Sequence, residues 1–97
     1  MSSDEPFSVE VLLQANIDIM SLLQRHRGRA SFAGIVRAFE NARMRLRSDA
    51  REIGDPLYHL RTMKMTIMGI VEMPLYVDYV VHDERNVVVI RSVQLIR

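Results

Sequence analysis

The chain has 97 residues, of which 48% are hydrophobic and 26% charged, and its formal net charge is +1. This size and composition predict one globular domain, residues 1–97, with a single core, and they exclude a disordered chain. The absence of cysteine excludes disulfide frameworks, thiolate metal sites and a cysteine nucleophile, and it fits a reducing cytoplasm. We expect no secretory signal, because the N-terminus has no basic region followed by an apolar stretch. We expect no membrane span either, because no apolar run approaches ~18 residues.

The N-terminal quarter predicts a short strand followed by a helix. Apolar and polar residues alternate over residues 7–11, which is typical of a half-buried strand. Ala15, Ile19 and Leu22 then recur at helical spacing, so we expect a helix over residues 14–26.

A second helix should follow after a short turn. Gly28 interrupts the first helix, and Ser31 can cap the second. Its apolar stripe is spaced by three and four residues and consists of Phe32, Ile35, Val36, Phe39, Ala42 and Leu46. Two amphipathic helices joined by a short turn predict a helical hairpin.

Charge is distributed unevenly, because the hairpin is rich in arginine. Residues 25–51 contain only Glu40 and Asp49 as acidic residues, against Arg25, Arg27, Arg29, Arg37, Arg43, Arg45, Arg47 and Arg51. Such a run is typical of a solvated helix face, but arginine also suits bidentate contacts to phosphate or carboxylate. The alternative to a solvated face is a surface for a polyanion or an acidic partner, with Arg37, Arg43 and Arg47 as binding residues.

Beyond Gly54 and Pro56 the apolar spacing changes from three or four residues to two, which predicts strands. We expect strands over residues 63–73, 75–82 and 87–93, the last two joined by a polar turn. In the first of these strands the residues predicted to face the core are Met63, Met65, Ile67, Val71 and Met73. In the second, Leu75, Val77, Tyr79 and Val81 should face one way, and Tyr76, Asp78, Val80 and His82 the other.

A second apolar sheet face is predicted as a binding surface. Met68 and Ile70 alternate with the predicted core positions, and Val80 could extend their patch on the next strand. Such a face needs a cover, which could be a dimer mate, an antitoxin-like segment or the end of the chain itself. The alternative is that the methionines only fill the core.

The predicted fold class is α+β in the order βααβββ, with a helical hairpin packed on one side of a small antiparallel sheet and the first strand at its edge. This order resembles the RelE/ParE toxin superfamily, and the segments 47–57, 74–84 and 87–93 resemble its passage from second helix to sheet, its third strand and its last strand. The resemblance implies a cytoplasmic toxin of a bacterial toxin–antitoxin pair, neutralised by an antitoxin segment. RelE-like members cleave messenger RNA on the ribosome, whereas ParE-like members inhibit DNA gyrase.

The residues that ribonuclease members use are largely replaced here. The family often has arginine where this chain has Tyr76, and a basic tail ending in tyrosine where this sequence reads Val93-Gln94-Leu95-Ile96-Arg97. Cleavage of RNA without a metal needs a base, an acid and cations at the phosphate. The remaining candidates for catalysis are Tyr76, His82 and Arg97.

No metal site or cofactor is predicted, since the histidines lack ligand spacing and no glycine-rich phosphate loop occurs. The leading hypothesis is therefore a toxin-like protein-interaction domain whose partner is an antitoxin-like protein or a second copy of the chain. The alternatives are an active endoribonuclease acting on RNA or the ribosome, and a gyrase inhibitor.

Overall fold

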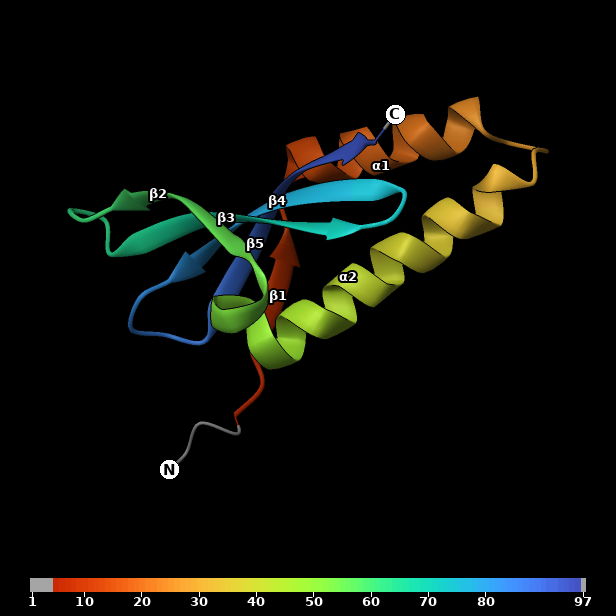
Figure 1. Cartoon of the computed structure of the whole chain (residues 1–97). Helices are drawn as coiled ribbons and strands as arrows, with labels where there is room; N and C mark the ends of the chain where they lie inside the picture. Colours follow the sequence, from red (N-terminus) through yellow and green to blue (C-terminus); the bar gives the residue numbers. More distant parts are fainter. Residues whose placement is uncertain (1–4, 97) are drawn as a thin grey trace.

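The computed structural model describes residues 5–96, which form one five-stranded sheet and two helices (Figure 1). In chain order the elements are β1 (Ser8–Val11), α1 (Leu13–Arg25), α2 (Ser31–Ile53), β2 (Asp55–Leu60), β3 (Met65–Glu72), β4 (Leu75–His82) and β5 (Val87–Leu95). Side chains of both helices join those of the sheet in one buried cluster. The predicted α+β class and the helical hairpin are confirmed.

The strand order is β1-β5-β4-β3-β2. Strands β2 to β5 form an antiparallel meander, and β1 returns to the sheet edge parallel to β5. The edge position predicted for the first strand is therefore correct.

The predicted order βααβββ lacks one strand, since β2 occupies a segment in which no strand is predicted from the sequence. The sequence of β2 does not show the usual pattern of a strand, for two physical reasons. It is an edge strand exposed at every residue except Leu60, so it has no alternation of buried and exposed positions. It also contains Pro56, followed by an irregular register before Tyr58. Proline is tolerated at a sheet edge but argues against a strand when only the sequence is read.

Strand β4 alternates as predicted, and its core residues are Leu75, Val77, Tyr79 and Val81. The assignment of faces on β3 is wrong. Met68 and Ile70 are each 4% exposed and belong to the core, because they pair with Tyr79 and Val77. Residues directly opposite each other in an antiparallel pair share a face.

The residues of β3 and its flanks that were predicted to face the core lie outside it. Met65 and Ile67 are half-buried, and Met63, Val71 and Met73 are more than half exposed. Both faces of β3 are apolar, so the spacing of its apolar residues does not say which face is covered. A shift of one residue moves every side chain to the opposite face.

Helix α1 covers the part of β5 that extends past the end of β1. The backbone N–H of Leu12 donates to the carbonyl of Ile90 (2.9 Å), after which the chain enters the helix. Six residues later, Asp18 Oδ2 accepts the backbone N–H of Val93 (3.1 Å). This bond occupies a backbone N–H on the edge of β5 that could otherwise pair with another strand.

Tyr79 joins the end of α2 to the centre of the sheet. Its side chain is fully buried, and its hydroxyl donates to the backbone carbonyl of Ala50 (2.6 Å). Burial raises the pKa of Tyr79 to about 12. The hydroxyl lies so close to Gly54 that a β-carbon there would collide with it. The absence of a side chain at residue 54 is therefore what lets the chain turn from α2 into β2 above this tyrosine.

We expect Tyr79→Phe to lower the free energy of unfolding by about 1–3 kcal/mol, because a buried carbonyl would lose its donor. For a chain of this length each 1 kcal/mol corresponds to roughly 4–8 °C in the melting temperature. Thermal unfolding followed by circular dichroism would measure it. Tyr58→Phe is the matched control, since Tyr58 is 64% exposed. Equal effects of the two substitutions would contradict the anchoring role of Tyr79.

Candidate functional site

The side of the sheet turned away from the helices carries a broad apolar surface, which we call the open face. Its apolar members are half-buried or exposed and come from four strands, β2 to β5: Tyr58, Leu60, Met65, Ile67, Val71, Val80, Val87 and Val89. A second apolar sheet face was predicted, but of the three residues named for it only Val80 lies there.

The centre of the open face is a straight row of side chains across four neighbouring strands. Tyr58 pairs with Ile67, Ile67 with Val80, and Val80 with Val89. Neighbouring strands lie about 4.8 Å apart, so the row is roughly 14 Å long. On β1 the row ends at Glu10, which pairs with Val89.

A polar group flanks this row at the β3–β4 hairpin end of the face. The ring of Tyr76 lies over Gly69, where a β-carbon would collide with the tyrosine hydroxyl. Asp78 pairs with Gly69 across the strands, and its Oδ1 lies 3.5 Å from Nη1 of Arg91. Arg91 is the extra residue at the irregular register between β4 and β5.

Asp78 is held in an unfavourable environment for its charge. Its Oδ1 is buried and has no hydrogen-bond partner among residues 5–96. Burial raises the pKa of Asp78, and the neighbouring guanidinium of Arg91 only partly offsets this effect. At 3.5 Å the pair with Arg91 therefore supplies attraction without a well-formed hydrogen bond.

The structure does not bring the predicted catalytic residues together. Tyr76 and His82 lie on one face of β4, but six residues apart, which corresponds to roughly 20 Å along a strand. His82 Nδ1 accepts the backbone N–H groups of Glu84 (3.0 Å) and Arg85 (3.1 Å), so this nitrogen holds the β4–β5 turn. Arg97 lies outside the described residues.

A cluster around Asp83 was not predicted from the sequence. Nε2 of His59 lies 2.9 Å from Oδ2 of Asp83, and the hydroxyl of Thr66 donates to Oδ1 (2.9 Å). The hydrogen bond from His59 is the main cause that lowers the pKa of Asp83, followed in the same direction by that from Thr66. The cluster ties edge strand β2 to the β4–β5 turn. The sequence does not reveal this cluster, because no strand is predicted over residues 55–60 that would place His59 beside Asp83.

The predicted arginine surface divides into different environments. Arg51 is structural: it donates to Asn86 Oδ1 (3.1 Å) and to the carbonyls of His82 (2.9 Å) and Arg85 (2.7 Å). Arg43 and Arg47 line a groove between α2 and β1. Arg37 is exposed on α2 and does not line that groove.

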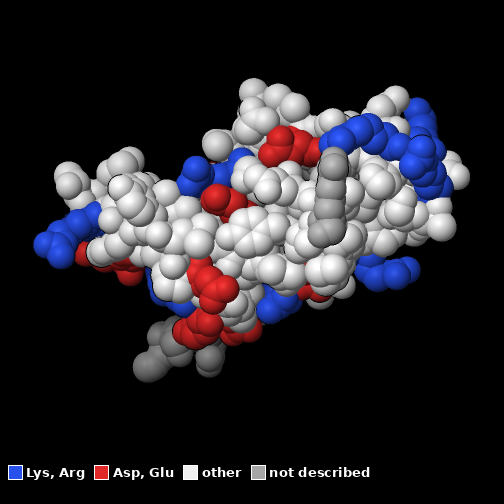
Figure 2. Space-filling view, turned by 45° about the horizontal axis from the view of Figure 1, so that its top comes forward, with Lys and Arg blue, Asp and Glu red and all other residues white. Residues whose placement is uncertain are grey.

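Basic side chains also gather at one end of the molecule. Figure 2 shows them over the end where α1 turns into α2, while much of the remaining surface in that view is uncharged. The residues around this turn include Arg25, Arg27 and Arg29. This end is separate from the open face, so the molecule presents a basic end and an apolar face.

Within residues 5–96, no three His, Asp or Glu side chains are grouped so that they could hold a metal ion. In the same range, no helix combines the length and apolar character needed to cross a membrane.

We expect Asp78→Asn to raise the melting temperature at pH 7. A carboxyl whose pKa is raised by folding makes the native state less stable once it ionises, so the gain should disappear as the pH falls below the ordinary aspartate pKa. Melting curves of both proteins between pH 3 and pH 7 would test this. A lower melting temperature of the variant at pH 7 would mean that the attraction to Arg91 outweighs burial.

Comparison with known proteins identifies the fold. No family model matches the sequence, and no curated protein matches it. Among solved structures, a chain of the toxin–antitoxin complex RelBE2 from Mycobacterium tuberculosis superposes with a TM-score of 0.67 and 21% identity. The match covers 93% of this chain and 91% of that one. The chain therefore has a RelE-like α+β fold, which confirms the resemblance at the level of the fold.

Proposed function

We propose that this protein is the toxin-like component of a bacterial toxin–antitoxin system and works in the cytoplasm through protein–protein contacts. Its partner is an antitoxin-like protein that covers the open face. The observation that carries this proposal is the row of Tyr58, Ile67, Val80 and Val89 across four strands. The similar fold within the RelBE2 toxin–antitoxin complex supports the class of system.

The apolar surface favours a protein partner. Ile67, Val80 and Val89 are half-buried, and Tyr58 is 64% exposed. Contiguous apolar patches beyond a few hundred Å² are uncommon on monomers and mark binding surfaces. An apolar sheet face of this kind suits the apolar side of a helix or strand, and tyrosine is among the residues that contribute most to interfaces.

We further propose that the protein does not cleave RNA efficiently. Metal-independent cleavage needs its base, acid and cation within reach of one phosphate. Tyr76 and His82 are separated by roughly 20 Å along β4. Arg91 is a cation on this face, but it lies beside the carboxylate of Asp78, which would repel a phosphate. These positions favour binding over catalysis.

We expect the double variant Ile67→Lys/Val80→Lys to lose the partner while it keeps its fold, because both side chains are partly exposed. The partner to test is the product of the reading frame next to this gene, co-expressed with the chain. Affinity should fall by about 100-fold or more, since two central apolar contacts are removed. Copurification and titration calorimetry would measure it.

The control for this experiment is Val36→Lys, which changes an apolar residue of α2 that is 39% exposed. It should bind as the unchanged protein does. A double variant that binds normally would contradict the open face as the interface. A protein that self-associates through this face, with no antitoxin-like partner, would overturn the proposal in favour of a homodimer.

We also expect no cleavage when the protein is incubated with translating ribosomes or with naked RNA. Primer extension on the recovered messenger RNA would detect cuts. Cleavage that is lost in Tyr76→Phe or His82→Ala would establish a ribonuclease instead. A parallel supercoiling assay with DNA gyrase would detect the third activity that is compatible with this fold.

A further inference from the structure

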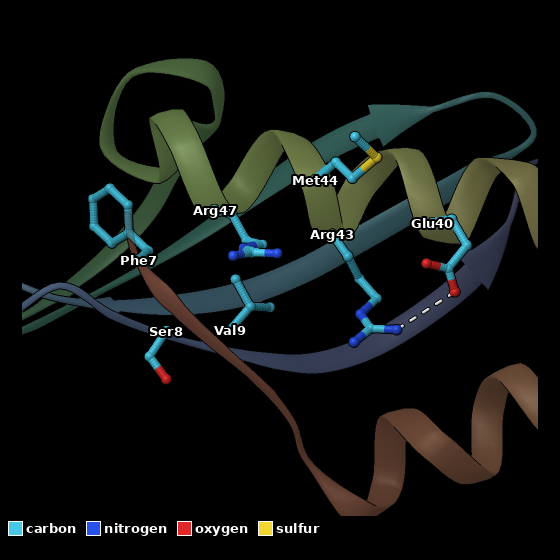
Figure 3. A pocket seen from close by; sticks show the side chains of 7 residues that line it. All are labelled: Phe7, Ser8, Val9, Glu40, Arg43, Met44 and Arg47. Carbon is cyan, nitrogen blue, oxygen red and sulfur yellow. Dashed lines mark hydrogen bonds and ion pairs between the residues drawn. The ribbon is translucent and has the colours of Figure 1, made fainter. Parts of the chain in front are cut away.

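A groove on the opposite side of the molecule has the features of a binding site for an extended peptide. It lies between α2 and the outer edge of β1 and has a volume of about 320 Å³. Figure 3 shows its lining: Arg43 and Arg47 of α2 point toward the side of β1, whereas Met44 points away from it. The lining residues are Phe7, Ser8, Val9, Glu40, Arg43, Met44 and Arg47.

The backbone of β1 has unpaired groups on this side. β1 pairs only with β5, and the N–H groups of Ser8 and Leu12 donate to the carbonyls of Asn86 (2.8 Å) and Ile90 (2.9 Å). In a parallel pair, alternate residues direct both backbone groups toward the partner strand. The N–H and carbonyl groups of Val9 therefore point away from β5 and toward the groove.

Within the described chain, the outward backbone groups of β1 are unpaired at Val9, whereas just before the strand the N–H of Phe7 is already bonded. The N–H of Phe7 donates to the carbonyl of Arg47 in α2 (2.8 Å), so α2 occupies the start of the edge. Among residues 5–96, no such bond from another element reaches Val9. An exposed edge of this kind is a template for an additional strand.

Two guanidinium groups stand over this edge. Arg43 and Arg47 are four residues apart and so lie on the same side of α2. Arg43 Nη1 is 3.4 Å from Glu40 Oε2, in an exposed pair that is weak. Within residues 5–96, Arg47 has neither an ion pair nor a side-chain hydrogen bond. Among the described residues, no carboxylate therefore neutralises Arg47, and only the weak pair with Glu40 reaches Arg43.

We propose that an extended acidic segment of the antitoxin-like partner adds to β1 as a sixth strand, with its carboxylates against Arg43 and Arg47. This inference rests on the proposed function, which supplies the antitoxin-like partner, and it specifies the chemistry of the segment that binds. Alternate side chains of the added strand would face α2, and the others would lie beside Ser8 and Glu10. Glu10 repels acidic residues there, so the segment alternates acidic with neutral or basic residues.

A nucleic acid fits the groove less well. Phosphates could contact the guanidinium groups, but they could not pair with the N–H and carbonyl of Val9 as a strand does. The groove is also lined by the partly buried Val9 and the exposed Met44, which suit the apolar part of a peptide. The combination of a strand edge with two cations therefore favours an acidic peptide.

The first test uses a fluorescein-labelled, acetylated nine-residue peptide that alternates glutamate and valine, with binding followed by fluorescence anisotropy. We expect the double variant Arg43→Glu/Arg47→Glu to bind it about tenfold more weakly or worse, because attraction becomes repulsion. The control Arg29→Glu/Arg37→Glu has the same net charge and changes residues outside the groove. Equal loss in both variants, or no binding to the unchanged protein, would overturn the proposal.

The second test separates strand addition from simple charge attraction. Two peptides carry N-methyl groups on alternate residues, one set on the glutamates and the other on the valines. Only one set can point at β1, so one peptide should bind and the other should lose binding. Equal binding of both would show that the carboxylates attach without forming a strand. A dodecauridylate that competes as well as the acidic peptide would show a phosphate site.

The outcomes also separate this proposal from the proposed function. The open-face variant Ile67→Lys/Val80→Lys should bind the peptide normally, since the groove lies elsewhere. An antitoxin-like partner that binds Arg43→Glu/Arg47→Glu as tightly as the unchanged protein would refute the groove and leave the proposed function intact. If the chain binds the acidic peptide but has no antitoxin-like partner, the proposed function is refuted and the groove remains a peptide site.

Discussion

The register between β3 and β4 determines most of what this molecule presents to its surroundings. Met68 lies opposite the fully buried Tyr79, and this pairing places one apolar side of β3 beneath the helices. The hydroxyl of Tyr79 in turn bonds to Ala50 at the end of α2. Had β3 paired one residue out of step, its other apolar side would be covered instead. One buried tyrosine thus connects the helix, the sheet register and the identity of the exposed face.

The two proposed binding surfaces follow from this arrangement. Packing of both helices on one side leaves the opposite side of the sheet open, with Ile67 and Val80 at its centre. The return of β1 to the sheet places an unpaired strand edge beside Arg43 and Arg47 of α2. One surface is apolar, whereas the other is a cationic groove with unpaired backbone groups. A partner that wraps from one to the other would use both kinds of contact.

Strand geometry also accounts for the separation of the groups proposed for catalysis. Alternation places Tyr76 and His82 on one face, but a strand rises about 3.3 Å per residue and so separates them along its length. His82 uses Nδ1 to hold the β4–β5 turn, and Asp78 is paired with Arg91. Sharing a face is therefore not the same as forming a site, and a periodic sequence pattern shows only the former.

Local apolar spacing was sufficient to predict the α+β class, the helical hairpin, the alternation of β4 and the edge position of β1. The strand at residues 55–60 and the burial of Met68 and Ile70 depend instead on how distant segments pack. An exposed edge strand has no alternation to read, and a strand with two apolar sides can be covered on either. The groove at Arg43 and Arg47 likewise requires β1 beside α2. Such choices depend on partners far apart in the chain, which local spacing does not encode.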